Sequence, residues 1–190
     1  EIAGKILGLI GYGNIGRELA KMSAAIGFNV MVYDPFVAPA AIEQAGYQYE
    51  ADMDRVLAAA DAVSLHVPLT PETRCLINAR SLALMKPNAV LVNCARGEIV
   101  DEAALFEALA NGRLHSAAAD VLSTEPVRPD HPLLQLENFI ITPHMAGLTQ
   151  EAAAGVCTMA AEGVLAVVNG RKWPHVANKE VYDHPDWRDK

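Results

Sequence analysis

Residues 5–16 read KILGLIGYGNIG, an apolar run that passes directly into a cluster of glycines. The apolar part is typical of a buried parallel strand, and Gly11, Gly13 and Gly16 have the spacing G-x-G-x-x-G. In that spacing the first glycine permits a tight turn, the second lets the backbone approach a pyrophosphate, and the third lets a helix pack against the strand. The free N–H groups and dipole of that helix attract phosphates. A glycine-rich turn without a ligand is the alternative, but the strand before it and the helix after it favour dinucleotide binding.

The rest of the chain alternates short apolar runs with amphipathic stretches. Strands are predicted at residues 5–10, 29–33, 62–65, 89–92, 116–119 and 139–141. The first helix is predicted from an apolar stripe ending at Gly27; its members are Ile15, Leu19, Met22 and Ile26. Others are predicted from Asp101 to before Gly112, after the N-cap pair Thr70-Pro71, and from about Gln150 to Val168 with Thr149 as cap.

This alternation predicts an α/β fold with a doubly wound parallel sheet, a three-layer Rossmann domain over residues 1–170. The loop at 123–138 holds three prolines and is longer than an ordinary connection, which is typical of a functional loop. Residues 171–190 form a C-terminal tail that we expect to pack on something outside this domain.

Composition excludes several classes of protein. The 190 residues are 52% hydrophobic and 20% charged, which is typical of one globular domain. The net charge of −8, with no cluster of Lys and Arg, argues against a nucleic-acid surface. No apolar run approaches the length of a membrane span. Cys75, Cys94 and Cys157 lack metal-site spacing, so we expect reduced, buried thiols, no metal and a cytoplasmic protein.

An acidic residue, Asp34, follows the second predicted strand in VYDPF. At this distance from the fingerprint a carboxylate accepts hydrogen bonds from the adenosine ribose and repels a 2′-phosphate. No Arg adjoins it, so the predicted cofactor is NAD and not NADP. The alternative is a solvated loop aspartate before a proline.

Three further residues each follow the end of an apolar run: Arg96 in NCARG, Glu125 in STEP and His144 in TPHMAG. A guanidinium holds a carboxylate with two parallel bonds, and an imidazole titrates near physiological pH. We predict Arg96 as an anion anchor, His144 as general acid/base and Glu125 as the group that orients it. Taken one at a time, each residue has another interpretation: Arg96 as a member of a surface ion pair, Glu125 as a solvated loop residue and His144 as a structural histidine.

Three more polar residues lie at or near predicted strand ends. His66, in SLHVPLT, is placed to shape the cofactor crevice, although a lone histidine there is more often structural; Thr73, in the next turn, has the same status. Asp120 closes the run AAAD and is placed to face the nicotinamide end of a cofactor; a cap or turn residue is the equal alternative.

Taken in order, these segments resemble the D-isomer-specific 2-hydroxyacid dehydrogenases, with a phosphoglycerate dehydrogenase-like branch favoured by YDPF and SLHVPLT. The resemblance covers residues 4 to about 169. It implies Arg96 as the substrate-carboxylate anchor, His144 as acid/base and Glu125 as its partner. It also implies a cofactor site whose members are Gly11, Gly13, Asn14, Ile15, Gly16, Asp34, His66, Pro68, Thr73, Ala95, Asp120 and Gly147.

The resemblance also implies a homodimer and a substrate domain whose larger part precedes the fingerprint. The expected function is therefore the NAD-binding domain of an oxidoreductase acting on a small 2-hydroxy or 2-keto acid, inactive by itself because its cleft is open to water. An alternative from another class is an NAD(H)-sensing interaction module of the corepressor type, which would bind protein partners and not DNA.

Overall fold

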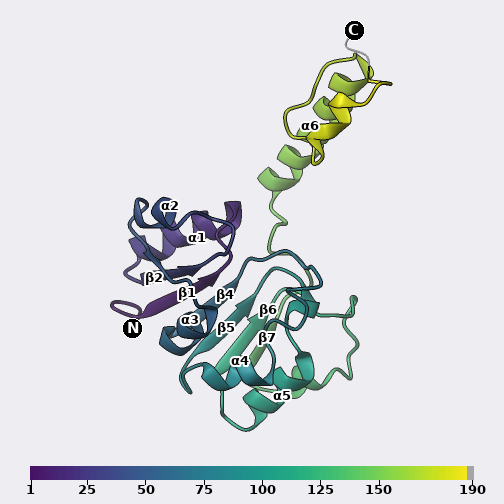
Figure 1. Cartoon of the computed structure of the whole chain (residues 1–190). Coiled ribbons are helices and arrows are strands. Elements are labelled where there is room, and N and C mark those ends of the chain that lie inside the picture. Colours follow the sequence, from purple (N-terminus) through teal and green to yellow (C-terminus); the bar gives the residue numbers. More distant parts are fainter. Residues whose placement is uncertain (188–190) are drawn as a thin grey trace. The chain divides into compact units, whose positions relative to one another are not determined.

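The computed structural model describes residues 1–187, and a seven-stranded parallel sheet forms the centre of the first of its two units (Figure 1). The sheet order is β3-β2-β1-β4-β5-β6-β7. The order reverses between β1 and β4, which is where open α/β sheets place a ligand. The strands are β1 Ile6–Ile10, β2 Asn29–Tyr33, β3 Gln48–Tyr49, β4 Ala62–Leu65, β5 Val90–Asn93, β6 Ser116–Ala119 and β7 Phe139–Ile141.

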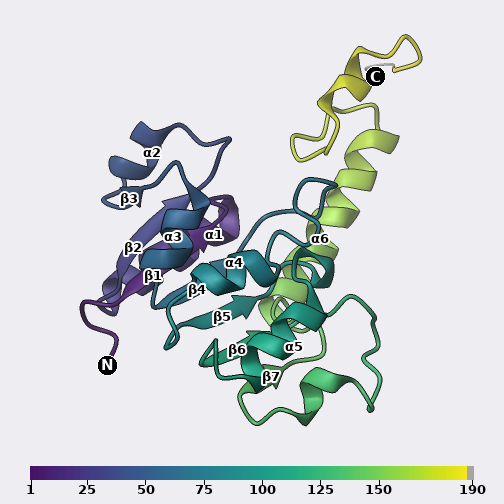
Figure 2. The same ribbon diagram turned by 60° about the horizontal axis from the view of Figure 1, so that its bottom comes forward.

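The connections between strands are mostly helical. The α-helices are α1 Asn14–Ala25, α2 Pro39–Glu43, α3 Met53–Ala59, α4 Ala79–Leu84, α5 Glu102–Ala110 and α6 Gln150–Val168; the 3₁₀ turns are η1 Gly97–Ile99, η2 Pro132–Gln135 and η3 Lys179–Asp183. Helices α3, α4 and α5 lie next to one another in a row (Figure 2), and α1 packs on β1 and β2.

The core consists of two apolar clusters because alternate side chains of a strand point to opposite faces of the sheet. Leu7 and Leu9 of β1 pack in the cluster that includes Ala20 of α1 and Ile42 of α2. Ile10 belongs to the larger cluster with residues of α3, α4 and α5. The predicted doubly wound Rossmann fold, covered on both faces, is confirmed.

The strand predictions hold closely. Four of the six predicted runs have the observed bounds, and β1 and β5 differ by a residue at their ends. The missing element is β3, which has two residues and pairs with β2 at the sheet edge. A strand this short leaves no periodic pattern to detect.

The helix predictions are correct at α5 and α6, whose caps Asp101 and Thr149 accept hydrogen bonds from the first turn as expected. The segment after Thr70 makes only a turn, because Cys75 follows with φ of 49° and the helix cannot continue. The apolar stripe predicted for α1 does not face the core, because its members Ile15, Met22 and Ile26 are exposed. The face toward the sheet carries small residues instead, because α1 lies too close to the β1 turn to admit larger ones.

The three cysteines are free, as predicted, but the prediction that they are buried is wrong. Cys75, Cys94 and Cys157 are all exposed. Each lies outside the strands that form the core, in a turn, a strand-end loop and an exposed helix face.

The second unit begins at Gly147 and contains α6 and the tail. Within it the tail folds back on the helix: the Trp173 ring lies against Gly163, and Tyr182 exchanges hydrogen bonds with the Trp173 backbone at 2.7 and 3.1 Å. These contacts group α6 with the tail, whereas the sequence prediction grouped it with residues 1–170. The functional division of the chain into domains stays a prediction.

One expectation about membranes needs correction. Helix α6 has 19 residues and contains an 18-residue window with a mean hydropathy of 1.5, enough by length and composition to cross a membrane. Glu151 and Glu162 interrupt its apolar run, so the sequence shows no continuous apolar stretch of that length. A single helix of this kind carries no membrane assignment.

Candidate active site

The glycine fingerprint has the geometry that its sequence predicts. Gly11 has φ of 101°, and a Cβ added there would lie 2.8 Å from the carbonyl of His66. A Cβ on Gly16 would lie 2.5 Å from the carbonyl oxygen of Gly11, so only glycine lets α1 approach the turn. Gly13 differs, because a Cβ there would meet nothing within 4 Å. Its missing side chain is therefore needed for no contact within the described residues, and it leaves space above the start of α1.

The N-terminus of α1 has no side-chain cap among the described residues. The N–H groups of its first turn, which includes the exposed Asn14 and Ile15, are thus available to an anion. This is the arrangement in which a helix N-terminus binds phosphate.

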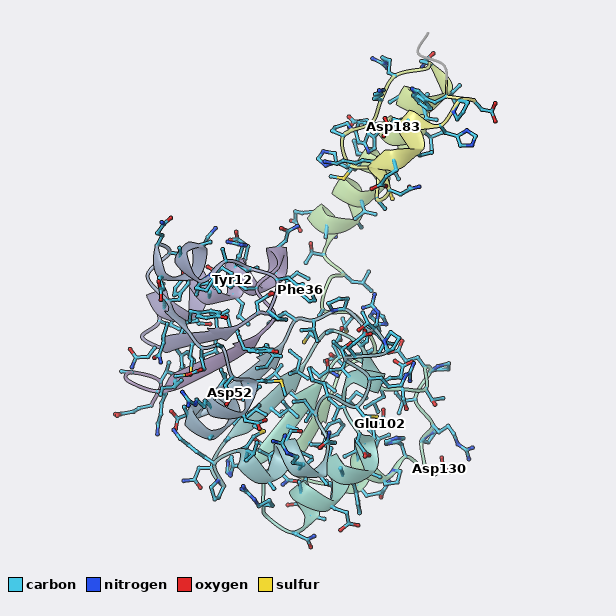
Figure 3. The ribbon with its side chains drawn as sticks, viewed as in Figure 1. Tyr12, Phe36, Asp52, Glu102, Asp130 and Asp183 are labelled. Carbon is cyan, nitrogen blue, oxygen red and sulfur yellow. The ribbon has the colours of Figure 1, made fainter. Side chains whose placement is uncertain are left out.

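Asp34 is buried at the end of β2 and ties the two neighbouring turns together. Its Oδ2 accepts the Tyr12 N–H and its Oδ1 accepts the Phe36 N–H, each at 2.8 Å. Tyr12 and Phe36 are both labelled in Figure 3. Each carboxylate oxygen has a second lone pair, so Asp34 can still accept hydrogen bonds from ribose hydroxyls.

His66 lies directly after β4, behind the fingerprint. Its Nε2 is 2.9 Å from Ser64 Oγ, and burial lowers the pKa of the imidazole below its ordinary value. Its backbone is the surface that Gly11 approaches. Thr73 closes the next turn by donating from Oγ1 to the Pro68 carbonyl at 2.6 Å. The His66 backbone therefore forms the wall against Gly11. Contact of His66, Pro68 or Thr73 with a cofactor stays a prediction.

Arg96 lies in a short loop after β5. The buried Asn93 side chain holds this loop at both ends, accepting from Ala95 N–H at 3.0 Å and donating to the Arg96 carbonyl at 2.9 Å. The guanidinium is exposed and donates to the Ala95 carbonyl at 2.6 Å. Gly97 follows, and a Cβ there would lie 2.0 Å from the Leu122 backbone. The Arg96 loop and the loop after β6 are therefore in direct backbone contact.

Asp120, buried at the end of β6, organises the loop that carries His144. Its Oδ1 accepts from Thr142 Oγ1 and from Met145 N–H (2.9 Å), and its Oδ2 accepts from Ala146 N–H at 2.8 Å. Burial raises the pKa of this carboxyl, but the three hydrogen bonds outweigh burial and leave the pKa below its usual value. Its backbone carbonyl also accepts the His144 N–H at 2.8 Å.

His144 and Glu125 form the pair that the sequence predicts. His144 Nδ1 lies 2.8 Å from Glu125 Oε2, and both side chains are partly open to solvent. His144 has φ of 52°, a conformation that residues with a side chain seldom adopt and that the Asp120 contacts maintain. With Nδ1 on the carboxylate, Nε2 has no hydrogen bond to any of the described residues and can face a reacting group.

The structure brings most predicted site residues to one edge of the sheet. Arg96 follows β5, Asp120 and Glu125 follow β6, and His144 follows β7, and these are neighbouring strands. Ala95 is half-buried in the Arg96 loop. Gly147 is the first residue of the second unit.

Sequence reasoning missed the residues that hold the site together. They are Asn93, Gly97, Glu102 and Thr142. Asn93 bonds across the turn that carries Arg96, whereas the other three contact segments that are distant in sequence. Asn93 and Gly97 flank Arg96 in NCARG, so that motif carried a signal; Glu102 and Thr142 had none.

Comparisons with known proteins give one consistent result. A model of the family described as "D-isomer specific 2-hydroxyacid dehydrogenase, NAD binding domain" matches residues 1–146. The chain is 44% identical over 178 residues to D-3-phosphoglycerate dehydrogenase of Methanocaldococcus jannaschii, covering 94% of this chain and 34% of that protein. It is 39% identical over 180 residues to glyoxylate reductase of Thermococcus litoralis, covering 95% and 54%.

A solved structure, the NAD-complexed D-isomer specific 2-hydroxyacid dehydrogenase of Lactobacillus delbrueckii ssp. bulgaricus, aligns with a TM-score of 0.83 at 35% identity. The alignment covers 92% of this chain and 56% of that one. This chain thus spans about a third to a little over half of the length of the relatives it matches. The matches confirm the resemblance drawn from the sequence.

Proposed function

Because this chain belongs to the D-isomer specific 2-hydroxyacid dehydrogenase family, as its NAD-binding domain, we propose that the enzyme carrying it transfers a hydride between NAD(H) and carbon 2 of a small 2-hydroxy or 2-keto acid. The observation that supports this most is the Glu125–His144 pair at 2.8 Å, which lies at the same edge of the sheet as Arg96. Relatives named D-3-phosphoglycerate dehydrogenase, at 43–45% identity, favour an acid of that type as the substrate.

The described residues fit NAD. The open space at Gly13 and the uncapped start of α1 suit the pyrophosphate, with Asn14 and Ile15 at its side. Asp34 would accept the ribose hydroxyls, and its negative charge would disfavour the 2′-phosphate of NADP. Gly11, Gly16, His66, Pro68 and Thr73 would form the wall of this site, and Ala95 and Asp120 would lie toward the nicotinamide. Gly147 stays a proposed cofactor contact from the family resemblance alone.

Each catalytic residue has a role that its geometry supports. Arg96, exposed at the loop tip, would hold the substrate carboxylate through two parallel hydrogen bonds. His144 would take the hydroxyl proton at Nε2 during oxidation and return it during reduction. Glu125 would fix the ring orientation through Nδ1 and stabilise the charged imidazole. NAD supplies the hydride acceptor when it is bound.

The remaining expectations concern the whole protein. Since relatives are longer than this chain, we propose that the domain alone binds NAD without efficient turnover, because a site open to water lacks the dry surroundings that favour hydride transfer. We further propose a homodimer in the cytoplasm. The corepressor alternative gains no support, since the relatives reported above are all named as enzymes.

The test is steady-state turnover of a panel of 2-keto acids with NADH, including the 2-keto acid derived from 3-phosphoglycerate, in the enzyme that carries this domain. Arg96→Lys keeps the charge but loses the bidentate fork, so the KM for the acid should rise about tenfold or more while the KM for NADH stays within about twofold. Arg55→Lys, on the exposed surface of α3, is the matched control. Turnover of no 2-keto acid would overturn the function; an unchanged KM for the acid in Arg96→Lys would overturn the anchor.

A further inference from the structure

Glu125 lies in a loop that is long and largely exposed. The loop runs from Ser123 to His131, between β6 and η2, and Glu125 itself is exposed. Within the loop, Arg128 and Asp130 form an ion pair at 2.9 Å whose side chains are 74% and 70% exposed. Exposed pairs of this kind contribute little to stability. In the middle of the loop, Val127 packs against the larger core cluster. The position of Glu125 beside His144 therefore depends on this contact and on what holds the two ends of the loop.

Both ends of this loop are bound by one carboxylate, that of Glu102 at the start of α5. Glu102 Oε1 accepts the Ser123 N–H at 2.6 Å, and Glu102 Oε2 lies 3.1 Å from His131 Nε2. The Glu102 and His131 side chains are only 17% and 20% exposed. Figure 3 labels Glu102 on α5 and Asp130 in the neighbouring loop. A charged acceptor with two donors and little competition from water forms strong hydrogen bonds.

The His131 ring has one orientation that satisfies all its contacts. Its Nδ1 accepts the Leu133 N–H at 3.3 Å, so in the neutral ring the hydrogen is on Nε2 and is donated to Glu102. The same ring thus caps η2 and fixes the far end of the loop.

The near end of the loop has a second constraint from the same region. Gly97 lies against the backbone of Leu122 and Ser123 so closely that a Cβ would be 2.0 Å from Leu122. Gly97 follows Arg96, and Glu102 begins the helix after η1. The segment 96–102 therefore carries the proposed anion anchor at one end and the carboxylate that holds the Glu125 loop at the other.

On this geometry we propose that Glu102 is a positioning residue for the reaction, which acts through the Ser123 backbone and His131 to keep Glu125 against His144. The proposal rests on the proposed function, since it assigns how that site is held. Glu102 touches neither Glu125 nor His144 through any hydrogen bond of the described residues. Its effect on catalysis must therefore pass through the loop.

The experiment is a double-mutant cycle on kcat for 2-keto acid reduction in the complete enzyme, with Glu102→Ala, Glu125→Ala and the double variant. Loss of loop position should lower kcat in Glu102→Ala by about ten- to a hundredfold, with the KM for NADH changed by less than about twofold. Because Glu102 acts through Glu125, adding Glu102→Ala to Glu125→Ala should lower kcat by no more than about twofold further. Glu102→Asp, which keeps the carboxylate on a shorter stem, should restore part of the lost kcat.

Glu107→Ala is the matched control. Glu107 lies on the same helix and is exposed, and its side chain accepts a hydrogen bond from Asn111 alone among the described residues, at 3.3 Å. Its removal should therefore leave kcat unchanged. A kcat in Glu102→Ala equal to wild type, or losses that multiply in the double variant, would overturn the proposal. Absence of turnover in the unmutated enzyme would instead overturn the proposed function, so the two failures are distinguishable. If Glu102→Ala does not fold, the Glu102→Asp cycle with Glu125→Ala gives the same comparison.

Discussion

The two halves of the sheet are built for their tasks in different ways. Around β1 and β2, the groups proposed to face a cofactor are backbone N–H groups at Gly13 and the start of α1, with one carboxylate, Asp34. Around β5, β6 and β7, the groups that matter are side chains from three separate loops, brought together by Asn93, Asp120 and Glu102. The function proposed for the first half, the fingerprint half, depends on glycines, which have no side chain to block the approach of a helix or a ligand. The second, the catalytic half, depends on hydrogen bonds between loops.

This difference explains how mutations should act. In the fingerprint half, a glycine can be needed for the fold, as Gly16 is, or only for the ligand, as Gly13 is proposed to be. In the catalytic half, a residue can be needed for chemistry, as His144 is proposed to be, or for holding a loop, as Asp120 is. Stability and binding measurements together separate these cases.

The largest effect is expected at Gly97, where two loops of the catalytic half are in close backbone contact. Gly97→Ala would place a Cβ 2.0 Å from Leu122, so the two loops must separate. We expect a loss of at least about 3 kcal/mol in the free energy of unfolding, measured by denaturant titration. Gly155→Ala, where a Cβ meets nothing within 4 Å, is the control. Wild-type stability in Gly97→Ala would show that the two loops are not fixed to each other.

The next effect concerns the carboxylate that holds the His144 loop. Asp120→Ala leaves the Met145 and Ala146 N–H groups and the Thr142 hydroxyl without their acceptor. We expect roughly 3 kcal/mol of destabilisation by denaturant titration, and a loss of turnover in the complete enzyme because the left-handed conformation of His144 is no longer maintained. Asp120→Asn, which keeps the shape and one acceptor, should lose less. Equal stability of wild type and Asp120→Ala would contradict the organising role of this residue.

A smaller effect, on binding alone, is expected in the fingerprint half. Gly13→Ala adds a methyl group into open space, so the unfolding free energy should change by less than about 0.5 kcal/mol. The same methyl group should obstruct the pyrophosphate and weaken NADH binding at least about tenfold, measured by calorimetry. Unchanged affinity would mean that the cofactor does not approach this turn.

The smallest effect is a pH dependence of stability from His66. Burial lowers its pKa in the folded state, so the unfolded chain binds more protons at mildly acidic pH. The stability that His66 contributes is fully present above about pH 6.5, the ordinary value, and is lost as pH falls through the lowered folded value. Denaturant titrations at several pH values between 7.5 and 4.5 should show a smaller decline in His66→Gln than in wild type. His115→Gln, at an exposed position, should decline as wild type does; equal declines in all three would contradict the burial effect.

The same contrast between the halves explains which features could be predicted from the sequence. The fingerprint and the strand runs were readable because each depends on neighbours in sequence: Gly11, Gly13 and Gly16 act within one turn, and a buried strand shows as an apolar run. The Glu125–His144 pair was predicted because each residue follows an apolar run and because a carboxylate beside an imidazole suits an acid/base.

Other features depend on contacts that no local pattern carries. The α1 stripe was misleading because the helix must approach Gly11, which forces small residues onto its inner face. In the sequence, Glu102 resembles any acidic residue in the first turn of a helix. Its hydrogen bonds to Ser123 and His131, which are 21 and 29 residues away, leave no local pattern. Such residues are found only when the loops are seen together.

The most direct test of this account measures NADH binding and turnover side by side in His144→Ala of the complete enzyme. The account predicts that the Kd for NADH, measured by calorimetry, stays within about twofold of wild type, because cofactor binding belongs to the fingerprint half. It predicts that kcat for 2-keto acid reduction falls at least about a hundredfold, because the proton transfer belongs to the catalytic half. Undiminished turnover, or a loss of NADH affinity as large as the loss of kcat, would contradict it.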